Sequence, residues 1–182
     1  DYACILNVPF AYSSNGSGFL EHDLIKGTER QLSLDDFPSP ENLWNRYCRE
    51  KEITPDQEPI LLQQYYFDAI TRKKPRYYQM NAINKTIEAI SRDQKRILLV
   101  MATGTGKTFT AFQIVHRLLE TRKVQRVLYL ADRNVLIDQT MVRDFKPFSK
   151  IMTKIQNRAM DSSYQIYMAL YQQLIGEGED KP

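Results

Sequence analysis

The residues with the clearest chemistry form a glycine-rich turn at positions 101–108, which reads Met-Ala-Thr-Gly-Thr-Gly-Lys-Thr. Glycine lets successive backbone N–H groups point inward around an anion, so a turn of this kind cradles nucleotide phosphates. Lys107 can reach the outer phosphates as the catalytic residue, and the Thr108 hydroxyl can hold Mg²⁺. The candidate phosphate-binding residues are Thr103, Gly104, Thr105, Gly106, Lys107 and Thr108. We therefore expect a nucleoside triphosphate with Mg²⁺ at this turn.

The elements around the turn agree with a phosphate-binding loop. The apolar run Arg96–Val100 predicts a buried strand before it, and helical spacing of apolar residues predicts a helix to about Glu120 after it. The N-terminus of that helix would aim its dipole at the same anion. Met101 departs from the strict motif, which has glycine there. This departure disfavours small nucleotide kinases and GTPases and favours helicase-type loops.

A second candidate group, Pro75-Arg76-Tyr77-Tyr78-Gln79, starts a helix expected over Tyr77–Ser91. The amide of Gln79 can pair with both polar edges of adenine, and Arg76 or a tyrosine beside Gln79 can stack on the base. A plain helix start on the surface is the alternative, and the nearby phosphate loop favours the nucleotide-binding interpretation. We therefore expect ATP in preference to GTP.

Two polar segments follow the further strands expected at Val127–Leu130 and Gln165–Ala169. Asp132 and Arg133 open a helix expected over Asn134–Phe145, and backbone phosphate of DNA is a natural ligand for such a helix start. A helix cap beside a solvated arginine explains Asp132 and Arg133 equally well. Tyr171 and Gln172 follow the second strand at its carboxyl end, where ligands of parallel sheets bind. We predict these four residues as DNA contacts.

Composition limits the class of protein. The chain has 182 residues, 42% of them hydrophobic, and a net charge of +3, which permits a packed core and a nucleic-acid partner. It has no apolar run of the roughly 18 residues that a membrane-spanning helix needs. Cys4 and Cys48 indicate reduced thiols in a cytosolic protein, and His22 and His116 suggest no metal site.

The chain divides into two blocks and a connector. Residues 1–50 predict short strands at Pro9–Ser14, Phe19–Leu24 and Gln31–Leu34, then a helix from Ser39-Pro40-Glu41 to about Glu50. This is too little for a stable domain, so we expect the C-terminal part of a larger one. Residues 51–75 predict a linker with a short helix near Leu61–Ile70. Residues 76–182 alternate strand and helix, the pattern of a parallel α/β sheet.

Taken in order, these pieces resemble the motors of superfamily 2 helicases. The amino-acid sequence of these segments is similar, more specifically, to the restriction (R) subunit of type I restriction endonucleases. Within residues 76–182, the resemblance rests on residues 98–108, 130–139 and 144–148. Residues 8–16 and 37–40 resemble the end of the nuclease domain that precedes the motor in that family.

The resemblance implies an α/β fold: a P-loop RecA-like parallel sheet with flanking helices, an incomplete first motor domain, preceded by the β-rich tail of a nuclease domain. Tyr2 would be the tyrosine of the family's Gln-x-x-x-Tyr helix. The implied parent protein translocates double-stranded DNA with ATP and Mg²⁺ and cuts it. It would work in the bacterial or archaeal cytoplasm with methyltransferase and specificity subunits.

The chain alone is expected to be inactive, because it has no Asp-Glu-x-His box, arginine finger or nuclease triad. We therefore interpret it as a fragment from the middle of such a subunit. Two alternatives stay open on the sequence. One is another superfamily 2 DNA helicase or a type III restriction subunit, and the other is a non-motor P-loop module that binds ATP.

Overall fold

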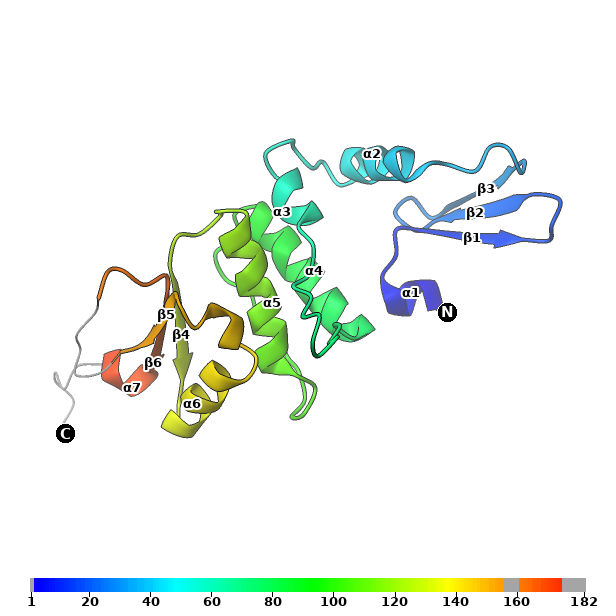
Figure 1. Cartoon of the computed structure of the whole chain (residues 1–182). Helices are drawn as coiled ribbons and strands as arrows, with labels where there is room; N and C mark the ends of the chain where they lie inside the picture. The colour runs from blue at the N-terminus through cyan, green and yellow to red at the C-terminus, as the bar shows by residue number, and fades with distance from the viewer. Residues whose placement is uncertain (1, 156–160, 175–182) are drawn as a thin grey trace, which may run out of the picture.

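The computed structural model describes residues 2–155 and 161–174 and has an elongated shape, with an N-terminal block at one end (Figure 1). This block contains α1 (Tyr2–Leu6), β1 (Phe10–Ser14), β2 (Phe19–Asp23), β3 (Thr28–Leu32) and α2 (Pro40–Glu50). Its strands pair antiparallel in the order β1-β2-β3. The predicted hairpin and helix are confirmed, whereas the third strand begins earlier in the chain than expected.

The connector differs from its prediction. The expected helix near Leu61–Ile70 is wrong, because the helix there is α3 (Glu58–Leu62) and residues 63–76 are not helical. Pro59 in the first turn suits a helix start, since proline has no N–H to leave unpaired. Farther along, the side chain of Gln113 bonds both backbone groups of Tyr66. Tertiary contacts therefore replace helical bonding in this segment.

The second block carries the helices and the parallel sheet. Its elements are α4 (Tyr77–Ser91), α5 (Lys107–Glu120), β4 (Val127–Ala131), α6 (Asn134–Val142), the 3-10 turn η1 (Lys146–Phe148), β5 (Met152–Lys154), β6 (Ile166–Leu170) and α7 (Tyr171–Leu174). The strand order is β4-β6-β5, and both pairings are parallel. The α/β class and the parallel sheet are therefore confirmed. β5 was not predicted, because three residues are too few to show a period.

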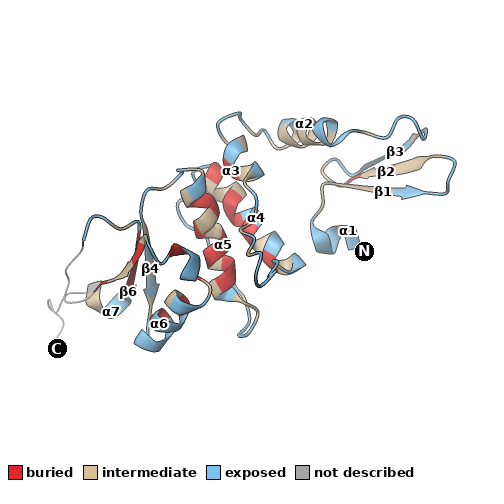
Figure 2. Cartoon of the chain, viewed as in Figure 1, coloured by how far each residue is buried: buried red, intermediate tan, exposed pale blue. Residues whose placement is uncertain are grey.

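Burial is concentrated in this second block, chiefly along α4, α5 and β6 (Figure 2). The main core packs α5 against one face of the sheet and includes Phe109, Phe112, Phe145, Ile166 and Met168. A second cluster joins α3, α4 and α5 through Ile60, Ile83, Ile87 and Leu118. The phosphate-loop helix α5 is therefore held from two sides. None of the helices in the described ranges is long and apolar enough to cross a membrane.

The buried strand expected at Arg96–Val100 is wrong. This segment belongs to neither sheet, and Leu98 and Val100 are 85% and 88% exposed. β4 itself is covered on one face only, because Leu128 and Leu130 are exposed. An apolar run becomes a buried strand only where neighbouring strands pair with it, and the described residues offer this segment none.

Candidate nucleotide and nucleic-acid sites

The glycine turn forms a loop at the N-terminus of α5. Gly104 and Gly106 have φ angles of +80° and +83°, which lie in the left-handed region that favours glycine. The Thr105 hydroxyl donates a 2.6 Å hydrogen bond to the Ala102 carbonyl and closes the turn. α5 begins at Lys107, so the first backbone N–H groups of the helix have no partners within the helix. These groups are the donors that a phosphate needs.

Lys107 lies at the same turn. Its ammonium donates to the Met101 carbonyl at 3.3 Å, so the side chain folds back over the loop. Thr103 is exposed, and Thr108 is half-buried in the first helical turn. One cation, one hydroxyl and a helix N-terminus thus meet at one place, and this set of donors fits a triphosphate with Mg²⁺. Met101 contributes a carbonyl, for which its side chain is immaterial.

Gln79 is buried against this loop rather than exposed beside it. Its side-chain oxygen accepts from the Arg76 N–H at 2.9 Å, and its amide donates to the Thr105 carbonyl at 2.9 Å. A methyl group placed on Gly106 would collide with the amide nitrogen of Gln79. Gln79 therefore connects the start of α4 to the phosphate loop.

Tyr78 is a second connection that sequence reasoning missed. Its hydroxyl donates to the Thr105 carbonyl at 3.3 Å and accepts from Arg76 at 3.4 Å. Lys73 was missed as well: it pairs with Asp144 at 2.6 Å and lies over the Phe109 ring at 4.1 Å. Neither contact could be predicted from local patterns, because Tyr78 and Thr105, like Lys73 and Asp144, are far apart along the chain.

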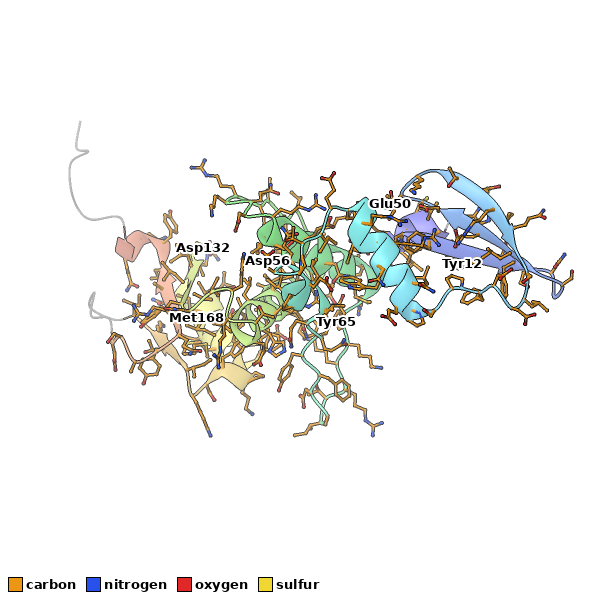
Figure 3. All side chains as sticks on the ribbon, turned by 90° about the horizontal axis from the view of Figure 1, so that it is seen from above. Tyr12, Glu50, Asp56, Tyr65, Asp132 and Met168 are labelled. Atoms are coloured by element: carbon orange, nitrogen blue, oxygen red, sulfur yellow. The ribbon has the colours of Figure 1, made fainter. Side chains whose placement is uncertain are left out.

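The predicted DNA-binding residues gather at the carboxyl ends of β4 and β6. Parallel pairing places Ala131 opposite Leu170, and Gln172 then donates to the Asp132 carbonyl at 3.3 Å. Arg133 lies 3.8 Å from the Asp132 carboxylate, with its side chain 80% exposed. Tyr171 is also exposed. Figure 3 shows Asp132 at the sheet end of the molecule, far from Tyr12 in the N-terminal block.

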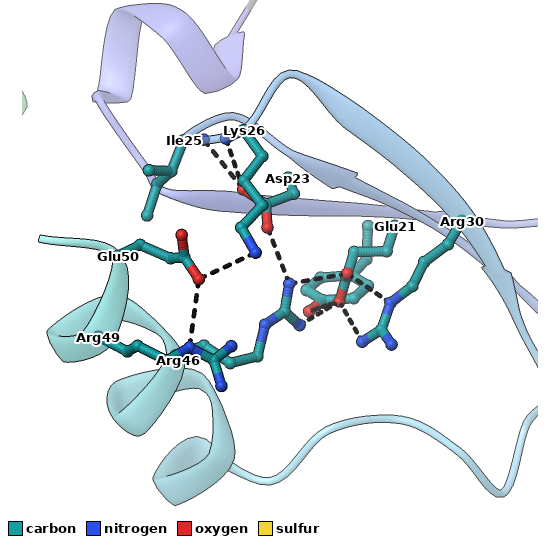
Figure 4. A network of polar contacts seen from close by, with 9 residues as sticks. Glu21, Asp23, Ile25, Lys26, Arg30, Arg46, Arg49 and Glu50 are labelled. Atoms are coloured by element: carbon teal, nitrogen blue, oxygen red, sulfur yellow. Dashed lines mark hydrogen bonds and ion pairs between the residues drawn. The ribbon is translucent and has the colours of Figure 1, made fainter.

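The N-terminal block contains a buried polar network that sequence reasoning also missed (Figure 4). Glu21 on β2 accepts hydrogen bonds from Tyr12, Arg30 and Arg46, the last at 2.7 and 2.9 Å. Arg46 also reaches Asp23 at 3.1 Å, which fastens α2 to the sheet. The only available signal was two acidic residues spaced to share one face of a strand.

Electrostatics in this network follow from its geometry. The hydrogen bonds from Arg46, more than any other contact, hold the pKa of Glu21 well below its usual range. Burial, followed by the hydrogen bond to Glu21, raises the pKa of Tyr12 to about 12. The network is therefore ionised at Glu21 and neutral at Tyr12 at neutral pH.

Tyr2 lies on α1, and its side chain is 85% exposed. α1 meets the second block through Asn81, whose amide donates to the Ile5 carbonyl at 2.9 Å. Within the described ranges, histidine, cysteine and acidic side chains form no cluster that could hold a metal ion. Thr108 stays a prediction as a ligand of Mg²⁺ that arrives with a nucleotide.

The glycine loop at the start of α5, on an α/β framework with a parallel sheet, places the second block in the P-loop RecA-like class of folds. The chain belongs to the family described as "Type III restriction enzyme, res subunit", whose family model matches residues 72–181. It is also homologous to endonuclease subunits of type I restriction enzymes. It is 51% identical, over its full length, to the EcoAI endonuclease subunit of Escherichia coli, and it covers 23% of that relative. To the EcoKI endonuclease subunit of Escherichia coli K12 it is 32% identical, covering 74% of this chain and 12% of the relative.

Two solved structures resemble this chain. A fragment described as the HsdR subunit of a type I restriction enzyme from Vibrio vulnificus matches 96% of this chain with a TM-score of 0.79 and 38% identity. This chain covers 31% of that structure. T4 UvsW, at 16% identity and a TM-score of 0.52 over 74% of this chain and 31% of its own, shares the fold alone. The chain therefore spans less than a third of the length of these relatives.

Proposed function

We propose that this chain is the part of a type I restriction endonuclease subunit that binds ATP with Mg²⁺. The triphosphate would lie in the loop Thr103–Thr108, with Lys107 on the outer phosphates and Thr108 on Mg²⁺. The observation that carries this proposal is the direct bond between Gln79 and Thr105, since it brings the candidate base-binding segment against the candidate phosphate loop.

The adenine would lie at the start of α4, beside Arg76 and Gln79. The oxygen of the Gln79 amide accepts one hydrogen bond and has a second lone pair for a base. Its nitrogen donates to the Thr105 carbonyl at 2.9 Å and lies 3.5 Å from the Gly106 carbonyl, so a base would compete for the longer of these two contacts. Base recognition would thus use the hydrogen-bonding capacity that the amide has left. Its existing hydrogen bonds would meanwhile hold the phosphate loop against α4.

Double-stranded DNA would bind at the other cluster. Asp132, Arg133, Tyr171 and Gln172 come from two adjacent strand ends and are all exposed. The N-terminus of α6 and the exposed guanidinium of Arg133 suit the phosphates of the DNA backbone, which are the same in every DNA sequence. We therefore propose contacts that do not depend on DNA sequence.

In the parent protein, this ATP-binding part would drive translocation along DNA and support its cleavage. Its partners would be methyltransferase and specificity subunits in the bacterial or archaeal cytoplasm. Residues 1–50 would end the nuclease domain, with Tyr2 near its site, residues 51–75 would link the domains, and residues 76–182 would begin the motor. The homology to type I endonuclease subunits along the whole chain supports this assignment.

ATP hydrolysis by the full-length subunit in its complex, with and without plasmid DNA, tests this function. Lys107→Ala should abolish DNA-stimulated phosphate release, because it removes the cation on the outer phosphates. Lys123→Ala is the matched control, since Lys123 is an exposed lysine paired with Asp93 at the far end of α5. DNA-stimulated turnover that survives Lys107→Ala would refute the proposal.

A further inference from the structure

The chain that leaves α3 crosses the phosphate-loop helix before it reaches α4. Gln113 on α5 is fully buried, and its amide bonds both backbone groups of Tyr66, accepting at 2.9 Å and donating at 3.1 Å. The Tyr66 ring also meets Phe112 and His116 edge-on. Gln113 thus satisfies both the backbone N–H and the backbone carbonyl of Tyr66, as a neighbouring strand does in a sheet.

A second contact lies one residue earlier. The Tyr65 hydroxyl donates to the Asn84 side-chain oxygen at 2.8 Å, and Arg117 of α5 donates to the same oxygen at 3.1 Å. The Arg117 guanidinium also lies 4.4 Å over the Tyr65 ring. Tyr65, α4 and α5 are therefore joined at one point. Figure 3 labels Tyr65, which lies between α2 and the parallel sheet.

The same connector is fastened at its other end to the N-terminal block. Trp44 of α2 donates to Glu58 at 3.0 Å, and Arg92 at the end of α4 donates to the Lys51 carbonyl at 2.8 Å. Displacement of α5 would consequently pull on residues 63–67 and, through them, on α2. α5 also begins at Lys107, directly after the loop, so a ligand held by the loop would act on this helix.

We propose that residues 63–67 form a strap that couples the phosphate-loop helix α5 to the N-terminal block, with Gln113 as its positioning residue. The proposal rests on the proposed function, since it treats α5 as part of the motor and the N-terminal block as part of the nuclease. Gln113 contacts neither nucleotide nor DNA in this scheme. Its role is to keep the second block in a fixed position relative to the N-terminal block while ATP is hydrolysed.

The test uses the full-length subunit in its complex, as Gln113→Met, Asn84→Ala and a control, Gln139→Met. Methionine keeps the length of glutamine but removes both bonds to Tyr66. Asn84 is exposed, so its replacement tests the strap should Gln113→Met fail to fold. Gln139 is an exposed glutamine on α6, outside the strap. The readouts are chymotrypsin cleavage after Tyr65 and Tyr66, DNA-stimulated ATP hydrolysis, and DNA cuts made per ATP hydrolysed.

We expect chymotrypsin to cut Gln113→Met about tenfold faster than wild type, the effect of losing two buried hydrogen bonds. ATP turnover should stay near wild type, and DNA cuts per ATP should fall; Asn84→Ala should follow more weakly and Gln139→Met not at all. Unchanged proteolysis of Gln113→Met and Asn84→Ala would overturn the strap. Faster proteolysis with a normal number of DNA cuts per ATP would overturn the proposed coupling of α5 to the N-terminal block. So would a loss of ATP turnover as large as the loss of DNA cleavage. Failure of the proposed function would instead appear as DNA-stimulated ATP turnover that survives Lys107→Ala, whatever the strap variants do.

Discussion

The side-chain amide nitrogen of Gln79 lies 2.9 Å from the carbonyl oxygen of Thr105, so the start of α4 and the phosphate loop form one unit. The opposite end of the amide accepts from the Arg76 N–H. Gln79 is 5% exposed, and a buried amide that loses its partners destabilises its surroundings. Movement of α4 should therefore change the loop, and a change in the loop should move α4.

Replacement of Gln79 should affect base choice more than triphosphate binding. Gln79→Ala should remove the preference for ATP over GTP, because the base edges of the two nucleotides reverse donors and acceptors. Competition binding with ATP, GTP and tripolyphosphate measures this. Gln94→Ala is the control, since Gln94 is an exposed glutamine outside the site. Equal affinity of the wild type for ATP and GTP would contradict base reading by Gln79.

Two glycines with similar backbone angles should respond differently to alanine. Gly16 and Gly106 have φ angles of +91° and +83°, so alanine at either costs about 1 kcal/mol in backbone strain. A methyl group on Gly16 would meet nothing within 4 Å, whereas on Gly106 it would collide with Gln79. Urea unfolding and ATP titration should show greater destabilisation and loss of ATP binding for Gly106→Ala only. Normal ATP binding by Gly106→Ala would show that the loop keeps its shape despite the collision.

The buried carboxylate of Glu21 should make stability sensitive to acid. Its pKa is lowered in the folded chain by Arg46, so the stability it contributes is present above the unfolded value of about 4.3 and is lost as pH falls below it. Glu21→Gln should be less stable by roughly 3 kcal/mol at pH 7, because it leaves Arg46 without its main partner. Its stability should also fall less steeply below pH 5. Parallel acid limbs for the two proteins, measured by urea unfolding, would rule out this role.

Arg133 should contribute to DNA binding in a way that depends on salt and not on sequence. Arg133→Ala should weaken duplex binding and reduce the slope of log K against log salt by about 1, since one phosphate contact is lost. Arg126→Ala is the control, because Arg126 is exposed and precedes β4, at the opposite end of the strand. Fluorescence anisotropy over a range of salt concentrations measures the slope. Identical slopes for Arg133→Ala and wild type would remove Arg133 from the interface.

Features set by neighbouring residues were predictable from the sequence. The loop at 103–108, the helices α4 and α5 and the strand ends before Asp132 and Tyr171 all follow from local patterns, and the structure confirms these elements. Parallel pairing then accounts for the meeting of Asp132 with Gln172, because both follow adjacent strand ends.

Features set by distant residues were not predictable. The Glu21–Arg46 network joins residues 25 positions apart, and the Gln113–Tyr66 pair joins residues 47 apart. The strand expected at Arg96–Val100 failed for the same reason, because a strand depends on partners that its own composition does not reveal. The helix expected near Leu61–Ile70 failed because Gln113 bonds both backbone groups of Tyr66, which are then not available to a helix.

Equilibrium binding of Mg-ATP to the 182-residue chain tests most directly whether residues 103–108 form an ATP site. ATP at 100 times its dissociation constant should raise the free energy of unfolding of the wild type by about 2.7 kcal/mol, seen as a thermal shift. Lys107→Ala should lose most of this shift, and Lys123→Ala should keep it. A Lys107→Ala chain that responds to Mg-ATP like the wild type would contradict the account.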